Sequence, residues 1–460
     1  MLDLFSAAQA LGARMVGGNA EFTRVTTDSR DIRPGDLFVG IRGKRFDGQE
    51  FAAQALAAGA VAALISDESP VTGPASRLLV VRDTRLALGQ LAAYWRARFA
   101  IPLIAITGSN GKTTVKEMLA AILRLSTGEN GVLATADNLN NDIGMPLTLL
   151  RLRNQHRCAV VEMGMNHLGE ISYLSRLAKP TAALITNAGT AHIGELGSLE
   201  AIARAKGEIF EGLDKAGTAI INSDDAFADF WRNLAKPRQV LSFGLESKAA
   251  VSARYELAEA GSLITIMTSE SHFVATLNVP GLHNVKNALA AAAAAHALGI
   301  DAKAIAAGMA DFRGIKGRLQ RKRLPTGATL IDDTYNANPD SMRAAIAVLS
   351  AHTGPKVFVM GDMGELGETA SAMHAEVGEF AKRAGVDRLF ALGDMSAEAV
   401  RGFGDGGVHF LAMEDLLDTI TSVLTRDTAL LIKGSRFMRM ERVVEALGAL
   451  NGEQTAKGGA

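Results

Sequence analysis

The chain has little cysteine and no excess of charge of either sign. Cys158 is its single cysteine, so no intramolecular disulfide can form, which indicates a reducing compartment. Its 48 Lys and Arg residues nearly balance its 49 Asp and Glu residues, and the formal net charge is -1. Proteins that bind nucleic acid through its phosphates usually carry a basic excess. We therefore expect no nucleic-acid partner.

Long apolar runs and targeting patterns are also absent. No segment reaches the roughly 18 apolar residues that a membrane helix needs. The densest segment, residues 288–298, is mostly alanine and is interrupted by His296. The first residues lack the basic region that precedes the apolar part of a secretory signal. Together these absences predict a cytoplasmic protein with no membrane span.

The composition and the order of apolar segments predict a multidomain α/β protein. Hydrophobic residues make up 48% and charged residues 21% of the chain, as in ordinary globular proteins. At about 150 residues per domain, this length predicts about three domains. Short apolar runs alternate with helical patterns, which is typical of parallel sheets covered by helices. Central strands are expected at residues 103–107, 159–163, 182–186 and 218–222, and later strands at 328–331, 356–360, 388–392 and 429–432.

Residues 107–114 form the sharpest motif, TGSNGKTT. They follow an apolar strand and open a helix whose apolar residues recur with helical spacing. Glycines let the backbone N–H groups of such a loop face phosphate oxygens at a helix N-terminus. Lys112 can neutralise the terminal phosphates, and the Thr113 hydroxyl can bind Mg²⁺. Ile106 stands where the usual spacing has glycine, so the loop is a compact variant of a nucleoside triphosphate site.

Polar residues directly after other predicted strands point to the same region. Glu162, Asn187, Asp333, Asp362 and Lys433 all occupy such positions. Open α/β sheets bind ligands outside the carboxyl ends of their strands. Two sheets that face each other would therefore enclose one cleft between domains. A carboxylate such as Glu162 beside a phosphate loop suits Mg²⁺, which prefers oxygen ligands.

The loop TGSNGKTT resembles the ATP loop of the Mur ligases, the ATP-dependent amide-forming enzymes of peptidoglycan precursor synthesis. The resemblance extends over nearly the whole chain and implies three α/β domains. Residues 1–82 would form a small UDP-precursor-binding domain. Residues 83–313 would form the central, P-loop-type parallel-sheet ATPase domain. Residues 314–460 would form a Rossmann-like domain for the amine substrate, after a hinge at residues 312–318 that holds two glycines and three basic residues.

The resemblance also implies ATP and Mg²⁺ as cofactors and assigns residues to them. The whole loop, Thr107, Gly108, Ser109, Asn110, Gly111, Lys112, Thr113 and Thr114, would bind the nucleotide. Asn187 and His192 match family positions at the metal site, and Glu162 in place of Asp also fits the Mur pattern. Asn284 matches the contact to adenine. Arg318 matches the family arginine that reaches the ATP phosphates. Asp333 matches the family aspartate that holds the ribose hydroxyls.

Lys206 lies in a helical pattern at residues 201–213, where its phase points it into the apolar stripe. One reading is a lysine that lies along apolar surface and lifts its ammonium to water. The other is a buried amine with a lowered pKa that reacts with CO₂ and gives Mg²⁺ an oxygen ligand. Several Mur ligases carry such a carbamylated lysine, and residues 205–208 resemble that segment.

Residues 333–342 and 359–367 resemble the branch of the family that adds D-alanyl-D-alanine, and the Asp-Asn-Pro-Arg motif of the diaminopimelate-adding branch is absent. The resemblance implies UDP-MurNAc-tripeptide and D-Ala-D-Ala as substrates, and we expect a monomer. ATP would convert the peptide carboxylate into an acyl phosphate that the amine attacks, with Lys112, Glu162, His192, Lys206 and Arg318 as catalytic residues. Substrate contacts would come from all three predicted domains: Ser29, Arg30, Asn140, Asn141, Asn187, Tyr335, Asn336 and Asn338.

Other readings stay open from the sequence. One alternative is another Mur-type branch, which adds diaminopimelate or lysine. A P-loop phosphotransferase or NTPase would use the same loop and release phosphate without any amine. A non-catalytic nucleotide-binding protein would tolerate the loss of Glu162 and Lys206 and still bind ATP. A dinucleotide site is disfavoured because the glycines at 361, 364 and 367 have the wrong spacing.

Overall fold

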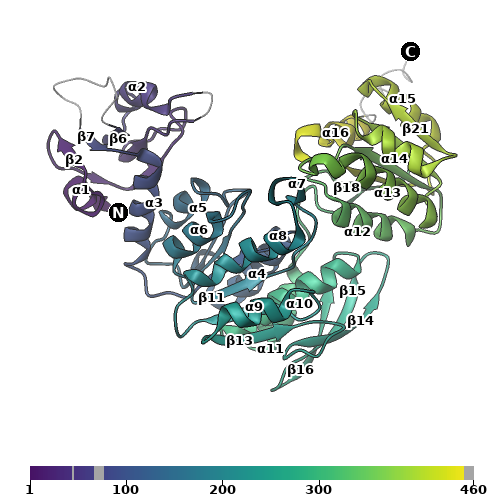
Figure 1. Cartoon of the computed structure of the whole chain (residues 1–460), viewed down its shortest axis with the longest axis horizontal. Coiled ribbons are helices and arrows are strands. Elements are labelled where there is room, and N and C mark those ends of the chain that lie inside the picture. Colours follow the sequence, from purple (N-terminus) through teal and green to yellow (C-terminus); the bar gives the residue numbers. More distant parts are fainter. Residues whose placement is uncertain (44–45, 67–76, 450–460) are drawn as a thin grey trace, which may run out of the picture.

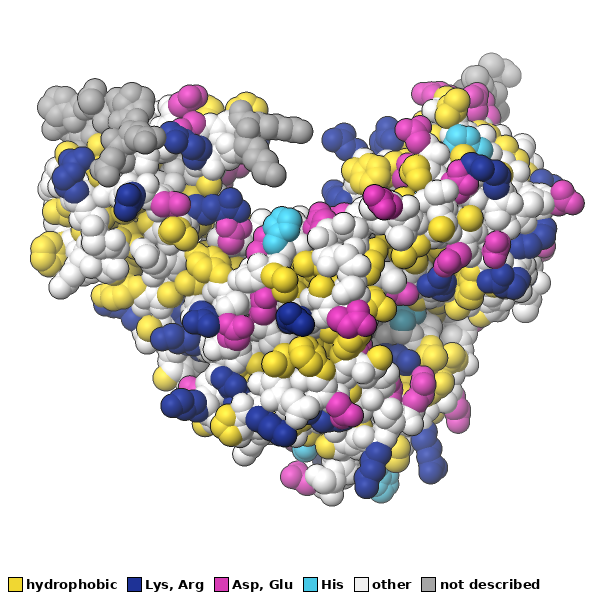
Figure 2. Space-filling view, viewed as in Figure 1, with side chains coloured by type: hydrophobic (Ala, Val, Ile, Leu, Met, Phe, Trp, Pro, Cys, Tyr) yellow, Lys and Arg dark blue, Asp and Glu magenta, His cyan; other side chains and the backbone are white. Residues whose placement is uncertain are grey.

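The computed structural model describes residues 1–43, 46–66 and 77–449. Three α/β domains follow one another along the chain, coloured purple, teal and green to yellow in Figure 1. The first and third domains stand apart on either side of the central one, and the space-filling view shows a wide notch between them (Figure 2). Within the described ranges, no helix is long and apolar enough to cross a membrane.

The first domain has a five-stranded sheet in the order β2-β7-β6-β5-β4. Its strands are β2 (Arg14–Val16), β4 (Arg24–Thr26), β5 (Asp36–Val39), β6 (Ala62–Ser66) and β7 (Leu78–Val81), and β2 alone runs antiparallel to its neighbour. Helices α1 (Leu4–Leu11) and α2 (Ala52–Ala57) belong to this domain, with the short pair β1 (Leu2–Asp3) and β3 (Glu21–Phe22). Helix α3 (Thr84–Arg96) follows, and the side chain of Asp83 caps its N-terminus.

The central domain has a six-stranded parallel sheet in the order β13-β12-β11-β8-β10-β9. The strands are β8 (Leu103–Thr107), β9 (Val132–Ala134), β10 (Cys158–Glu162), β11 (Ala182–Ile185), β12 (Thr218–Asn222) and β13 (Gln239–Phe243). Alternate residues of β8 face opposite sides, as a strand requires. Ile104 and Ile106 pack with α4 (Lys112–Thr127), α10 (Leu282–Ala297) and α11 (Ala302–Asp311). Leu103 and Ala105 belong to the opposite core, with α3, α5 (Gly144–Leu149), α6 (Glu170–Ala178) and α8 (Leu199–Gly207).

A three-stranded antiparallel sheet adds to the parallel sheets that the sequence predicts. It consists of β14 (Ser252–Leu257), β15 (Ser262–Met267) and β16 (His272–Leu277). Its connections are too short for a crossover helix, so neighbouring strands must run antiparallel. Along β15, Ile264 and Ile266 are buried whereas Leu263 is exposed. The buried face packs into the same core as α10 and α11, and thereby extends the central domain.

The third domain has a six-stranded sheet in the order β17-β18-β22-β19-β20-β21. The strands are β17 (Gln320–Arg323), β18 (Thr329–Asp333), β19 (Lys356–Gly361), β20 (Arg388–Leu392), β21 (Gly407–Phe410) and β22 (Ala429–Lys433), and only the edge strand β17 is antiparallel within it. Helices α12 (Pro339–Ser350), α13 (Ala370–Arg383) and α14 (Ser396–Phe403) cover one face. Helices α15 (Met413–Val423) and α16 (Glu441–Ala449) cover the other.

Candidate active site

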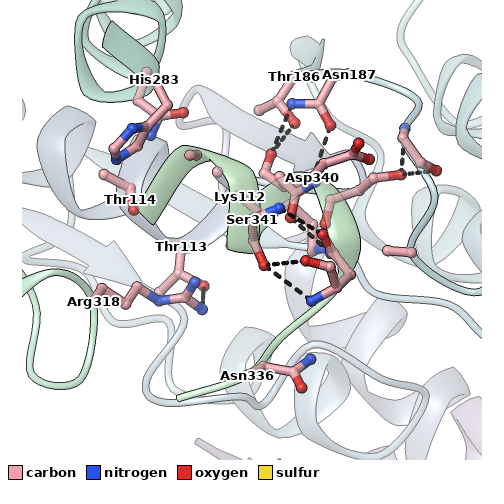
Figure 3. Close-up of a pocket in the computed structure, with 18 of the residues that line it drawn as sticks. Lys112, Thr113, Thr114, Thr186, Asn187, His283, Arg318, Asn336, Asp340 and Ser341 are labelled. Carbon is pink, nitrogen blue, oxygen red and sulfur yellow. Dashed lines mark hydrogen bonds between the residues drawn. The ribbon is translucent and has the colours of Figure 1, made fainter. Parts of the chain in front are cut away.

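A cavity of about 810 Å³ lies where the carboxyl ends of the central strands meet those of the third domain (Figure 3). This is the cleft that the positions of the polar residues predict. Most predicted site residues line it: Ser109, Asn110, Gly111, Lys112, Thr113, Thr114, Asn140, Glu162, Asn187, His192, Asn284, Arg318, Asp333, Tyr335, Asn336 and Asn338. The cavity therefore joins both domains into one candidate site.

The phosphate loop needs its two glycines. Gly108 and Gly111 have φ angles of 145° and 83°, in the region that favours glycine. A Cβ on Gly108 would lie 1.8 Å from the Thr186 hydroxyl oxygen. Helix α4 begins within the loop motif, at Lys112, so its unpaired N–H groups and dipole favour an anion there. The loop is built to receive phosphate.

Lys112 folds back over the loop. Its Nζ donates to the carbonyl oxygens of Gly108 at 2.6 Å and Ser109 at 3.3 Å. Burial lowers the pKa of the Lys112 ammonium, while the carboxylate of Glu162 opposes that shift. A nucleotide phosphate would give this cation a stronger partner than the two carbonyls.

The residues after β11 hold the loop in shape. Asn187 Oδ1 accepts from the Asn110 backbone N–H at 3.0 Å, and its Nδ2 donates to the Asn110 carbonyl at 3.1 Å. The Thr186 hydroxyl donates to the same carbonyl at 2.7 Å. Both amide atoms of Asn187 thus bind the loop backbone. Its predicted contact to metal or substrate stays a prediction.

Glu162 ends β10 and is 2% exposed. Its Oε1 accepts from Asn140 Nδ2 at 2.8 Å, whereas Oε2 is buried with no hydrogen-bond partner among the described residues. A buried carboxylate oxygen without a donor fits a divalent cation. The described part of the chain has no cluster of three His, Cys, Asp or Glu side chains placed to hold a metal. Mg²⁺ is usually held by one or two carboxylates with waters and phosphates, so such a cluster is not required.

His192 contacts the third domain. It lies just before α7 (Ile193–Leu196) with a φ of 66°, and its Nδ1 is 2.8 Å from Glu365 Oε2. This contact lowers the pKa of the Glu365 carboxyl. Sequence reasoning missed Glu365, because nothing in the sequence says which residues of two domains will meet.

Lys206 is 1% exposed, near the end of α8. That burial excludes the reading in which its ammonium reaches water. Burial, helped by the charge of Lys112, lowers the pKa of Lys206 well below its usual value. Lys206 does not line the cavity, so its place at a metal site stays a prediction.

Arg318 reaches from the third domain to the phosphate loop. Its Nη2 donates to the Thr113 hydroxyl at 3.0 Å, and the two side chains lie side by side in Figure 3. The guanidinium stacks on the Tyr335 ring, with its carbon 4.2 Å from the ring centroid. Stacking of this kind fixes the orientation of a guanidinium. A cation from the third domain is thereby held over the loop of the central domain.

Asp333 and Lys433, at the ends of β18 and β22, form an ion pair in the wall of the cavity. Lys433 Nζ lies 2.6 Å from Asp333 Oδ2 and donates to the Asn336 carbonyl at 2.8 Å. Burial raises the pKa of the Asp333 carboxyl, and the charge of Lys433 opposes this. Burial, with the charge of Lys433, also lowers the pKa of His283 to about 4, so this cavity residue is neutral at pH 7.

The start of α12 docks onto the central domain. Asn338 caps α12, and its Nδ2 donates to Asn110 Oδ1 at 2.9 Å. Asp340 Oδ2 accepts from the backbone N–H and the hydroxyl of Thr190, both at 2.9 Å. Asp340 is another residue whose role sequence reasoning missed, since there it indicated only a helix start.

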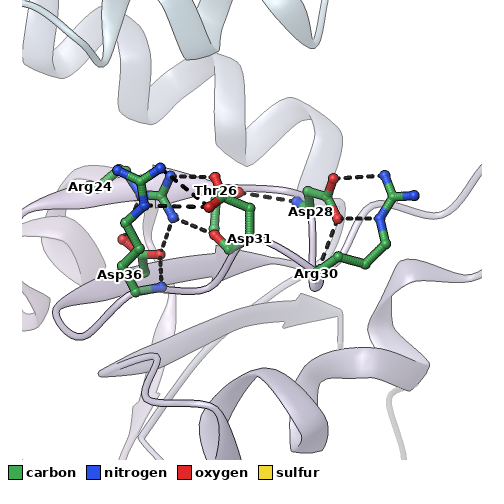
Figure 4. A network of polar contacts seen from close by, with 7 residues as sticks. Arg24, Thr26, Asp28, Arg30, Asp31 and Asp36 are labelled. Carbon is green, nitrogen blue, oxygen red and sulfur yellow. Dashed lines mark hydrogen bonds and ion pairs between the residues drawn. The ribbon is translucent and has the colours of Figure 1, made fainter.

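Some predicted residues lie elsewhere or have their polar atoms occupied. Ser29 and Arg30 lie on the turn after β4, and Arg30 pairs with Asp28 at 2.8 Å (Figure 4). This turn is anchored by Arg24, which binds Asp31 and the buried Asp36. Three more bind within the chain: the Thr107 hydroxyl donates to the Met163 carbonyl, and Asn141 Oδ1 accepts from the Gly144 N–H at the start of α5. Asn284, which lines the cavity, donates to the Pro280 carbonyl.

The fold and the site together define a three-domain α/β protein with a nucleotide-type phosphate loop at a domain junction. Three domain families match the chain: "Mur ligase family, catalytic domain" at residues 21–96, "Mur ligase middle domain" at 106–295, and "Mur ligase, glutamate ligase domain" at 317–436. The chain belongs to the Mur ligase family.

Curated relatives and solved structures match almost the whole chain. UDP-N-acetylmuramoyl-tripeptide--D-alanyl-D-alanine ligase of Escherichia coli is 42% identical over 95% of this chain and 96% of its own. The enzyme of the same name from Bacillus subtilis is 37% identical over 92% of each chain. A crystal structure of MurF from Acinetobacter baumannii superposes with a TM-score of 0.90 at 39% identity, covering 96% of this chain and 98% of its own. MurF of Thermotoga maritima, solved with ADP, gives 0.81 at 27% identity, covering 92% and 97%.

Proposed function

We propose that the chain is an ATP-dependent ligase that joins D-alanyl-D-alanine to UDP-MurNAc-tripeptide, the last amino-acid addition to that peptidoglycan precursor. The observation that carries this proposal is the Arg318 guanidinium of the third domain on the Thr113 hydroxyl of the phosphate loop. A simple nucleotide-binding domain has no need of a cation from a second domain. The relatives that bear this enzyme's name match 95% and 92% of the chain, which favours this branch over the diaminopimelate-adding one.

In the proposed mechanism the loop and Lys112 bind the ATP phosphates, while Arg318 neutralises charge from the opposite side. When bound, ATP would supply the γ-phosphoryl that activates the peptide carboxylate, and Mg²⁺ would neutralise charge on the phosphates. Asp333 would hold the ribose and Asn284 the adenine. The chain contributes alignment and charge stabilisation, because the acyl phosphate is itself reactive: the amine would attack its carbonyl carbon, and inorganic phosphate would leave.

We propose that Glu162, Thr113 and His192 hold Mg²⁺, together with a carbamylated Lys206. The partnerless Oε2 of Glu162 supports this assignment. The lowered pKa of Lys206 supports carbamylation, because only the neutral amine reacts with CO₂. His192 now contacts Glu365, so it would have to exchange that partner for the metal.

We further propose three functional units in a monomer. Residues 1–82, with Ser29 and Arg30, would bind the UDP part of the precursor, and 83–313 would bind ATP. Residues 314–460, with Tyr335, Asn336 and Asn338, would bind the dipeptide. Asn140, Asn141 and Asn187 would face the tripeptide.

A phosphate-release assay with ATP, UDP-MurNAc-tripeptide and a panel of amines tests the proposal. We expect release only when D-Ala-D-Ala is present with the tripeptide. Stimulation by diaminopimelate or lysine instead would identify another branch of the family. Equal release without any amine would identify an NTPase.

A further inference from the structure

Lys116 is a buried cation that the proposed mechanism does not use. It follows Lys112 by one turn of α4, and its side chain is 1% exposed. Burying an ammonium is costly unless hydrogen bonds compensate for the lost water. A methionine or leucine would fill the same interior position without that cost. The contacts of the ammonium must therefore explain why a lysine stands there.

Those contacts lead to the strand that carries Glu162. Lys116 Nζ donates to the Thr135 carbonyl at 2.5 Å and lies 2.6 Å from Glu117 Oε1. Thr135 directly follows β9 and is 1% exposed. Its hydroxyl oxygen accepts from the Glu162 backbone N–H at 3.0 Å, and its own N–H donates to the Val160 carbonyl at 3.0 Å. Thr135 therefore connects the Lys116 ammonium to the backbone of Glu162.

We propose that Lys116 is a positioning residue that, through Thr135, fixes Glu162 relative to the phosphate loop. Helix α4 carries Lys112 and Thr113 in its first turn, and β10 carries Glu162 at its end. The Lys116 ammonium bonds this helix to the Thr135 carbonyl at the end of β9, and β9 pairs with β10. The spacing between the loop and the carboxylate is thereby set. This inference rests on the proposed function, in which Glu162 binds Mg²⁺ beside the nucleotide phosphates.

The main alternative is a structural lysine that satisfies one buried carbonyl. A structural role predicts lower thermal stability with an unchanged Mg²⁺ requirement. A positioning role predicts a higher Mg²⁺ requirement in a variant that is still folded. The two roles therefore differ in a property that can be measured without turnover.

The test uses the full chain with Lys116→Met, which keeps length and packing but removes the charge. Binding of a fluorescent ATP analogue is measured in EDTA and across a Mg²⁺ titration. We expect affinity in EDTA to stay within about twofold, and half-saturating Mg²⁺ to rise about tenfold, the usual effect of losing support behind a metal ligand. Lys303→Met, on the exposed face of α11, is the matched control and should change neither value.

A second pair of variants covers the case in which Lys116→Met fails to fold. Thr135→Val removes the hydroxyl that accepts from the Glu162 N–H and should also raise the half-saturating Mg²⁺ concentration. Thr135→Ser keeps a hydroxyl and should leave that concentration at the wild-type value. Both residues act on one carboxylate. In the double variant Lys116→Met with Thr135→Val, the fold rise in half-saturating Mg²⁺ should therefore be smaller than the product of the two single-variant rises.

An unchanged Mg²⁺ requirement in folded Lys116→Met, or in folded Thr135→Val, overturns the positioning role and leaves the proposed function standing. Wild-type protein whose nucleotide affinity does not depend on Mg²⁺ overturns the proposed metal site, and this inference with it.

Discussion

At the scale of single residues, Lys112 is the side chain on which turnover should depend most. Its ammonium now binds two carbonyls of its own loop, so removing it breaks no hydrogen bond between that loop and the rest of the described chain. We expect Lys112→Ala to lose nearly all turnover and to keep its circular dichroism spectrum. A phosphate assay measures the first and the spectrum the second. Activity within about tenfold of wild type, or about 1.4 kcal/mol of barrier, contradicts the assigned role.

Lys206 gives a second prediction at this scale. If a carbamate on its amine binds Mg²⁺, Lys206→Ala should lose most activity, and acetate should partly restore it by occupying the vacated space. Lys206→Met also removes the amine but fills that space, so acetate should not rescue it. Steady-state rates across an acetate titration compare the two variants. A fully active Lys206→Ala enzyme would show that the amine is not needed.

The site residues also show what a sequence can predict. Lys112 was predicted from the motif TGSNGKTT, whereas Glu162 and Asp333 were predicted from their places at the ends of apolar strands, because parallel strands bring such positions to one edge. Asp340 and Glu365 were missed because their partners lie in another domain. Contacts of that kind depend on how two domains dock, which no local pattern records.

At the scale of elements, the apolar strands were predictable and the edge strands were not. The observed bounds of β8, β12 and β20 equal the predicted ones, because their buried apolar runs are sharply bounded. Strand β17 reads Gln-Arg-Lys-Arg and has no apolar residue. It forms through pairing with β18, supported by Lys322 on Asp332 at 2.8 Å. Tertiary pairing, rather than local preference, makes it a strand.

The start of α12 is the element that couples the two halves of the site. Asp340→Ala would remove both hydrogen bonds to Thr190, which join the start of α12 in the third domain to the central domain. We expect at least a tenfold loss of turnover with little change in melting temperature, because α12 keeps its Asn338 cap. Asp340→Asn retains an acceptor oxygen and should lose less. Equal activity of Asp340→Ala and wild type would show that this contact does not matter for catalysis.

At the scale of the whole molecule, the two domains on either side of the predicted hinge at residues 312–318 are already in contact. Arg318 binds the phosphate loop and His192 contacts Glu365, so the central and third domains meet at the site. The first domain stands across the notch from the third (Figure 2). A precursor bound by the first domain must reach the cavity with its peptide end, and hinge motions commonly complete a site in this way. The remaining closure should therefore bring the first domain toward the other two.

Small-angle scattering can test this closure. We expect the radius of gyration to fall when an ATP analogue and UDP-MurNAc-tripeptide are added together, because the precursor alone connects the first domain to the cavity. The ATP analogue alone should change the radius of gyration little, because the phosphate loop and Arg318 are already in contact. An unchanged radius with both ligands at saturation would mean that the notch does not close around substrate, and that the tripeptide spans it in the arrangement seen here.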